Sequence, residues 1–165
     1  MADELRQWTV AGGILAREGR VLLVQNQRRN GDVDWSPPGG VIDEGESAIE
    51  GLRREVEEET GFQVQAWSGP IYRIEVEAPG FGFFLRVEAH LALDFGGELR
   101  IDDPDGIVIG AEFVDAELAR LRLDGAPRWV AEPVLDHVID GVDDGRLYSY
   151  RLEGSGPEDR NVVRL

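Results

Sequence analysis

The first forty residues alternate apolar stretches with polar turns. Residues 9–15 and 20–25 are rich in Val, Leu and Ile, so they predict two strands joined by a turn at residues 17–19. Residues 26–34 are polar and contain an Asn-Gly pair, which predicts a loop. A Trp-Ser-Pro-Pro-Gly-Gly stretch then leads into a short extended piece at Val41 and Ile42.

Helical periodicity is strongest between residues 48 and 60. Ser47 and Glu50 have the spacing of a capping box, in which each side chain satisfies a free amide at the helix start. Gly61 follows where a helix favours a left-handed residue. An apolar stripe at helical spacing comprises Ile49, Leu52 and Val56. The stripe predicts that one face of this helix is buried.

Beyond this helix the pattern returns to strands. Extended segments are predicted at residues 63–67, 70–77, 83–93 and 111–114, with an acidic loop at residues 98–106. A second helix is predicted from Trp129 to Ile139, with Pro133 in its first turn, where proline is tolerated. The tail after Gly154 is expected to be loose. Strands flanked by two helices predict an α/β or α+β sandwich, in one domain over residues 1–165.

Composition narrows the class of protein. With 42% hydrophobic residues, 165 residues can bury one sizeable core. Cysteine is absent, which excludes disulfides, thiolate nucleophiles and cysteine-based zinc sites. No segment resembles a signal peptide or a membrane span, so we expect a cytoplasmic protein that does not bind membranes.

The formal net charge of −16 argues against nonspecific nucleic-acid binding, which relies on Lys and Arg at the phosphates. A phosphorylated small molecule stays possible as a partner, provided that metal cations or a local basic patch overcome the repulsion. The charge is equally well explained by solubility alone.

Three carboxylates share one face of the first helix. Glu55, Glu58 and Glu59 are spaced by three and four residues, and like charges at that spacing destabilise a helix by roughly 0.2–0.5 kcal/mol per pair. Clustered carboxylates are the oxygen ligands that Mg²⁺ and Mn²⁺ prefer. Gly51, one turn before Glu55, suggests room for metal and phosphate to approach the backbone. The alternative for the glutamates alone is a solvated acidic face.

The complete pattern from Gly40 to Phe62 favours the metal site. A glycine, a glutamate, an Arg-Glu pair, an apolar residue, two glutamates, a glycine and a final apolar residue stand at fixed spacing. This segment resembles the box of the Nudix family at every defined position. The resemblance implies an α/β/α sandwich with a mixed sheet and a catalytic loop–helix–loop, which agrees with the order of elements predicted above.

The resemblance also implies roles for individual residues. Glu55, Glu58 and Glu59 correspond to the metal-binding carboxylates, with the carbonyl of Gly39 as a further ligand. Arg54 corresponds to the arginine that orients this cluster, through a carboxylate partner such as Glu46. The implied cofactor is Mg²⁺, for which Mn²⁺ can substitute.

The implied reaction is substitution at phosphorus by water, with a carboxylate as the general base. Glu55 is our first choice for the base. In the family, the base can also come from a later loop. Here the acidic loop offers Asp102, Asp103 and Asp105, and for each of them an exposed turn is an equally good interpretation.

Several other side chains are candidates for substrate binding. Arg28 and Arg29 could contact a phosphate, and Trp35 could stack on a base, although solvated arginines and a packing tryptophan explain them as well. Four further aromatic residues could line a base pocket: Tyr72, Phe81, Phe83 and Phe84. For Phe83 and Phe84, which lie in a predicted strand, a core position is favoured.

Within the family, a MutT-like nucleoside triphosphate pyrophosphohydrolase is the first expectation, acting for example on oxidised dGTP. An ADP-ribose or nucleotide-sugar pyrophosphatase is the alternative; Pro79 lies near the position of a proline typical of ADP-ribose enzymes, but not on it. A non-catalytic nucleotide-binding module is disfavoured because all four box glutamates are present. The expected assembly is a monomer or a homodimer.

Overall fold

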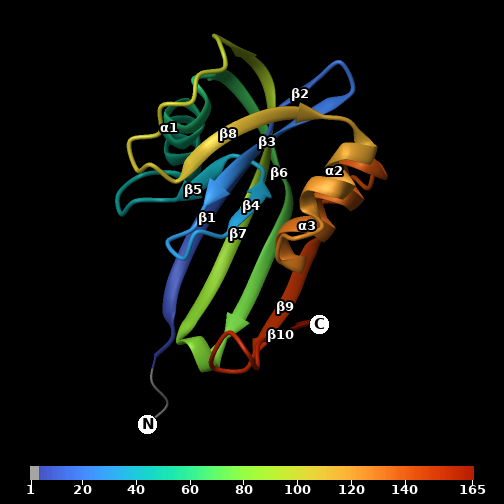
Figure 1. Cartoon of the computed structure of the whole chain (residues 1–165). Coiled ribbons are helices and arrows are strands. Elements are labelled where there is room, and N and C mark those ends of the chain that lie inside the picture. The colour runs from blue at the N-terminus through green and yellow to red at the C-terminus, as the bar shows by residue number, and fades with distance from the viewer. Residues whose placement is uncertain (1–3) are drawn as a thin grey trace.

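The computed structural model describes residues 4–165 and contains two sheets with helices on both sides (Figure 1). The larger sheet has the order β10-β9-β6-β7-β1-β5. Its strands are β1 (Arg6–Ile14), β5 (Gly39–Val41), β6 (Gln63–Ala78), β7 (Phe83–Gly96), β9 (Leu147–Glu153) and β10 (Asn161–Arg164). The sheet is mixed, because β1–β7 and β6–β9 are parallel and the other pairs are antiparallel.

The smaller sheet is antiparallel and centres on β3. Its strands are β2 (Ala16–Arg17), β3 (Arg20–Gln27), β4 (Val33–Ser36) and β8 (Val108–Val114). The expected turn is present, since Glu18 and Gly19 have φ of 54° and 76°. It closes the short β2–β3 hairpin, however, and the two strands predicted at the N-terminus lie in different sheets.

The predicted bounds of the first helix are confirmed, because α1 is Ala48–Thr60. The Ser47 hydroxyl accepts from the amide of Glu50 at 3.1 Å, and the Glu50 carboxylate accepts from the amide of Ser47 at 3.2 Å. Gly61 ends the helix with a left-handed φ of 81°. The remaining helices are η1 (Pro79–Phe81), α2 (Ala116–Leu123), α3 (Arg128–Val134) and the π-helical η2 (Leu135–Ile139).

The C-terminal third differs most from the sequence-based expectations. Pro133 lies inside α3 rather than in its first turn, and the chain continues as a π-helix from Leu135, a change that suits a residue without an amide hydrogen. The tail after Gly154 is not loose throughout, because β10 pairs with β9. Helix α2 was not predicted, although Asp115 caps it by accepting from the amide of Leu118 at 2.9 Å.

Two apolar clusters hold the layers together. Leu52 and Val56 of α1 pack into one cluster with Leu22, and helices α2 and α3 pack into the other with Val21 and Leu23. Neighbouring residues of β3 therefore face opposite layers, as the period of two in a strand requires. Figure 1 shows α1 on one side of the sheets and α2 with α3 on the other. The predicted α+β sandwich with a mixed sheet is confirmed.

Residues 4–165 contain no helix that is long and apolar enough to cross a membrane.

Candidate active site

Two glycines bring the box into contact with the sheet. Gly39 and Gly40 pair with Gly12 and Ala11 of β1. A Cβ atom on Gly39 would lie 2.1 Å from the carbonyl oxygen of Ala11, at a φ of 152° that side chains rarely adopt. A Cβ atom on Gly40 would lie 2.6 Å from the carboxyl carbon of Glu55. Both positions need glycine because backbone and carboxylate approach so closely there.

Arg54 lies at the centre of the box. Its Nε and Nη2 donate to the two oxygens of Glu46, each at 3.0 Å, in a bidentate pair. Its Nη1 donates to Glu55 at 3.0 Å and to Glu58 at 3.3 Å. These bonds raise the pKa of Arg54 and lower the pKa of Glu46. The expected partnership of Arg54 with Glu46 is therefore present. Since Nη2 also donates to Asp43 at 3.2 Å, one guanidinium contacts four carboxylates.

The prediction that Gly51 makes room for a metal or a phosphate is wrong. A Cβ atom on Gly51 would lie 2.7 Å from Oε1 of Glu46 and 2.7 Å from Cδ1 of Ile42. The glycine thus makes room for the loop that carries Glu46, and not for a metal or a phosphate.

Glu59 is the most buried carboxylate of the box. Only 8% of the residue is exposed, and its carboxylate accepts one hydrogen bond, from the amide of Gly39 at 3.1 Å. Burial raises the pKa of Glu59 to about 8, with a further contribution from the neighbouring charges of Glu55, Asp103 and Glu58. Burial also raises the pKa of Glu55, against the opposing effect of Arg54. Such a pair of desolvated carboxylates is a typical environment for a bound cation.

The acidic loop is fastened to this end of the helix. The amide of Arg100 donates to the carbonyl of Thr60 at 2.8 Å. The carboxylate of Asp103 accepts from the amides of Ile107 at 3.0 Å and Val108 at 2.9 Å, so it holds the turn together. Asp105 lines the same cleft as Glu55 and Glu59.

Asp102 does not line the cleft. It lines a separate hollow beside α1, together with Arg54, Glu58 and Arg100. Of the three aspartates predicted as alternative bases, the structure therefore brings Asp103 and Asp105 to the cleft, and Asp103 is already engaged with the backbone.

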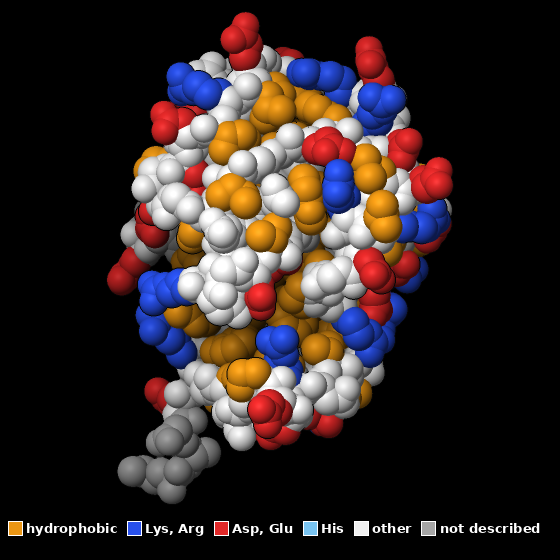
Figure 2. All heavy atoms as spheres, viewed as in Figure 1, with side chains coloured by type: hydrophobic (Ala, Val, Ile, Leu, Met, Phe, Trp, Pro, Cys, Tyr) orange, Lys and Arg blue, Asp and Glu red, His pale blue; other side chains and the backbone are white. Residues whose placement is uncertain are grey.

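The cleft has a volume of about 630 Å³ and two chemically different ends. Its acidic end is lined by Asp43, Glu55, Glu59, Asp103 and Asp105. Its apolar end is lined by Val10, Tyr72, Ile74, Leu85, Val87, Ala89, Trp129, Val130 and Val134. Figure 2 shows this face of the molecule hollowed, with hydrophobic side chains on the floor and charged side chains around the rim. A phosphorylated molecule with an apolar group fits this division.

The predicted substrate-binding residues separate in the structure. Arg28 lines the cleft and is held by a bidentate pair with Asp34, in which both N–O distances are 2.8 Å. It is the one basic residue lining the cleft within residues 4–165. Arg29 and Trp35 do not line it. Trp35 instead packs against the core, with the Arg122 guanidinium 4.8 Å from its ring centroid.

Of the four aromatic residues considered for a base pocket, Tyr72 alone lines the cleft. Most of the other lining residues were not predicted as site residues, and Asn26 and Trp129 are two of them. Asn26 is a buried polar residue in β3, and its amide donates to Asp34 at 3.1 Å and Ser36 at 3.0 Å. A polar residue directly after a run of buried strand positions was the available signal. Trp129 carried no such signal, because its position depends on how α3 packs.

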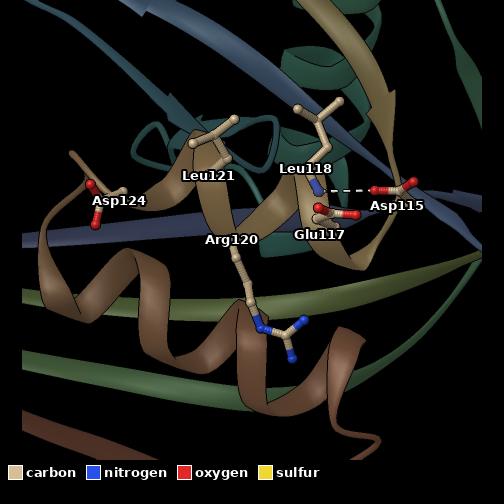
Figure 3. A pocket seen from close by; sticks show the side chains of 6 residues that line it. All are labelled: Asp115, Glu117, Leu118, Arg120, Leu121 and Asp124. Atoms are coloured by element: carbon tan, nitrogen blue, oxygen red, sulfur yellow. Dashed lines mark hydrogen bonds between the residues drawn. The ribbon is translucent and has the colours of Figure 1, made fainter.

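A second hollow, of about 640 Å³, lies over α2 (Figure 3). It is lined by Asp115, Glu117, Leu118, Arg120, Leu121 and Asp124. Figure 3 shows that these side chains all come from α2 and its two ends. No residue of the box contributes to it, so we place the active site in the cleft that Glu55 and Glu59 line.

Comparison with known proteins identifies the family. The NUDIX domain family model matches residues 5–136. A MutT-like protein of Streptomyces ambofaciens is 39% identical over 61 residues, which are 37% of this chain and 38% of that protein. The human 8-oxo-dGDP phosphatase NUDT18 is 30% identical over 93 residues, which are 56% of this chain and 27% of that protein. The matched regions thus span less than two fifths of either relative.

Solved structures share the fold. The MutT protein from Bacillus halodurans superposes with a TM-score of 0.67 at 23% identity, over 94% of this chain and 97% of that one. An ADP-ribose pyrophosphatase from Streptococcus suis gives a TM-score of 0.53 at 19% identity, over 85% and 98%. Since the family model covers most of the chain and the box from Gly40 to Phe62 is complete, the chain belongs to the NUDIX family.

Proposed function

We propose that this protein is a MutT-like hydrolase: it cleaves a nucleoside triphosphate to the nucleoside monophosphate and pyrophosphate, with Mg²⁺ as cofactor and Mn²⁺ as a possible substitute. The observation that carries the proposal is the cleft that joins an acidic end to an apolar end. The acidic end suits cation-bound phosphates, and the apolar end suits a nucleobase.

The carboxylates of the box fit a divalent cation by their chemistry. Glu55, Glu58 and Glu59, with the carbonyl of Gly39, would hold it. The raised pKa of Glu59 supports this, because a cation would offset both the burial and the repulsion that raise it. Within residues 4–165, no three acidic or histidine side chains converge into a finished coordination shell, so Glu58 would have to turn away from Arg54. When bound, Mg²⁺ neutralises the phosphate oxygens and lowers the pKa of water.

The remaining chemistry belongs to the protein. A water oxygen bonds to phosphorus, the bridging P–O bond breaks, pyrophosphate leaves, and the proton of the water passes to a carboxylate. Glu55 is our first choice for that carboxylate, and Asp105 is the alternative. Arg54 keeps Glu55 and Glu58 oriented, and Arg28 offers its remaining N–H groups to a phosphate.

The relatives leave the substrate open. One is named for 8-oxo-dGDP, and a structural neighbour is named for ADP-ribose. The test is therefore a hydrolysis screen with Mg²⁺ over nucleoside triphosphates, oxidised dGTP and dGDP, ADP-ribose, nucleotide sugars and dinucleoside polyphosphates.

We expect a nucleoside triphosphate to have the highest kcat/KM in this screen. A higher value for ADP-ribose or a nucleotide sugar would replace our proposal with a pyrophosphatase of that class. If nothing turns over with Mg²⁺ or Mn²⁺, a nucleotide-binding module without catalysis becomes the better description.

The identity of the base needs its own experiment. Glu55→Gln and Asp105→Asn each remove one carboxylate with little change of shape. If Glu55 is the base, Glu55→Gln should lower kcat by about 10²–10⁴-fold and Asp105→Asn by far less. The reverse order would assign the base to the acidic loop.

A further inference from the structure

The apolar end of the cleft contains one tyrosine, Tyr72, whose hydroxyl has no hydrogen-bond partner among residues 4–165. Tyr72 lies in β6, opposite Ala89 of β7, and lines the cleft. Only 4% of the residue is exposed. Within residues 4–165 its hydroxyl forms no hydrogen bond with another side chain or with the backbone. The hydroxyl is also not among the side-chain atoms that are fully enclosed without a partner, so a molecule in the cleft can reach it.

Two neighbouring tyrosines show what a satisfied hydroxyl looks like in this fold. Tyr148 donates to Asp136 at 3.1 Å, and Tyr150 is 3.4 Å from Glu132. The ring of Tyr148 lies edge-on to that of Tyr72, with 6.0 Å between the centroids. All three tyrosines are buried beneath α3 and η2, yet the protein supplies a carboxylate for two of them only.

The ionisation state of Tyr72 suits recognition rather than proton transfer. Burial raises the pKa of Tyr72 above its usual value, so the phenol stays protonated at neutral pH. A neutral phenol can both donate and accept one hydrogen bond.

The side chains that line the cleft together with Tyr72 restrict what can bind there. Ile74, Leu85 and Val87 of the sheet and Val130 and Val134 of α3 offer no hydrogen bonds from their side chains. A sugar placed among them would bury several hydroxyls without partners. A flat heteroaromatic ring would bury its faces against the aliphatic groups and present one polar edge to Tyr72.

We propose that the hydroxyl of Tyr72 is a specificity-determining group that hydrogen-bonds the polar edge of the substrate's nucleobase at the apolar end of the cleft. The inference deepens the proposed function and rests on it, since it names the residue that reads the base. The lost bond would weaken binding of the base and leave the phosphates untouched, so it should affect KM more than kcat.

The test compares Tyr72→Phe with the wild type on two substrates. One is the nucleoside triphosphate that the wild type hydrolyses best, and the other is ribose 5-triphosphate, which lacks a base. For the nucleotide we expect KM to rise by on the order of 5- to 10-fold, with kcat within about twofold. For ribose 5-triphosphate both constants should be unchanged. A matched control is Tyr148→Phe, which removes a hydroxyl bonded outside the cleft and should leave both substrates unaffected.

Two results would overturn the inference: no change in KM for the nucleotide, or an equal change for the nucleotide and ribose 5-triphosphate. If the wild type hydrolyses neither compound, the proposed function fails. Calorimetric titration with AMP, GMP, CMP and UMP then still tests whether Tyr72 recognises a nucleobase. The wild type should then bind at least one of them more tightly than ribose 5-phosphate, and Tyr72→Phe should lose most of that advantage. Equal binding by both proteins contradicts the role of Tyr72.

Discussion

The two ends of the cleft are built in opposite ways. The acidic end depends on Glu55 and Glu59, which lie four residues apart on α1, and on a guanidinium beside them in sequence. The apolar end assembles side chains from β1, β6, β7 and α3, more than a hundred residues apart at the extremes. A local pattern therefore encodes the two helix carboxylates of the acidic end, while Asp103 and Asp105 and the whole apolar end join the cleft only after folding. Mutations at the acidic end should therefore affect mainly kcat, and mutations at the apolar end should affect mainly KM.

The largest effect is expected from Glu59→Gln. The change keeps the shape and the bond from Gly39 but removes a proposed ligand charge, so kcat should fall by about 10²–10³-fold. Circular dichroism and thermal unfolding should show a protein that folds as before. Glu57→Gln, on the exposed side of the same helix, is the matched control. Unchanged activity in Glu59→Gln would remove Glu59 from the ligand set.

A smaller loss is expected from Glu46→Gln, which lies outside the cleft lining. The amide cannot accept both bonds of Arg54, so the guanidinium loosens and the box carboxylates lose their orientation. We expect kcat to fall by about 10–100-fold, the range typical of residues that orient metal ligands. Steady-state kinetics with Glu44→Gln, an exposed change in the same loop, provides the reference. A loss confined to KM would contradict the orienting role.

At the apolar end, Trp129→Ala should act on KM instead. The change removes part of the wall that α3 contributes, so KM for the nucleotide should rise by about tenfold while kcat stays within about twofold. Leu121→Ala, at a position that is 69% exposed and lines the hollow over α2, should change neither constant. A fall in kcat without a change in KM would show that the two ends are not separable.

The smallest effect is expected from Gly51→Ala, which tests whether the glycine makes room for Glu46. Alanine favours a helix by about 1 kcal/mol over glycine, but here its methyl group would displace Glu46 and Ile42. We expect a free energy of unfolding within about 1 kcal/mol of the wild type. We also expect kcat to fall several-fold, by less than about tenfold, because a displaced Glu46 would shift its hydrogen-bonded partner Arg54. The comparison is Gly125→Ala, where an added Cβ meets nothing within 4 Å.

The same division explains what the sequence could predict. The bounds of α1 followed from Ser47, Glu50 and Gly61, because capping involves residues within one turn. The pairing of Arg54 with Glu46 followed from the family resemblance and is present in the structure. The apolar end of the cleft did not follow, because it is formed by strands and a helix that are distant in sequence, and Tyr72 lines it while Phe83 does not.

Other errors have local causes. Trp35 and Arg29 lie in the right part of the chain, but β4 directs Trp35 toward the core and Arg122. Helix α2 is short, and its stripe is weak because Leu121 is exposed, so its Asp115 cap was the clearest signal. The order in the C-terminal tail depends on pairing with β9, which no local pattern announces.

The bond between Arg100 and Thr60 has a consequence for how such an enzyme can change over time. It joins the acidic loop to α1 through backbone atoms alone, so it survives any substitution at position 100 except proline. Asp103 closes the other side of the turn. Residues between these two anchors are free to vary, and Asp105 would keep its place beside Glu55 throughout. Both candidates for the general base should therefore stay in the same cleft when the residues between the anchors are changed.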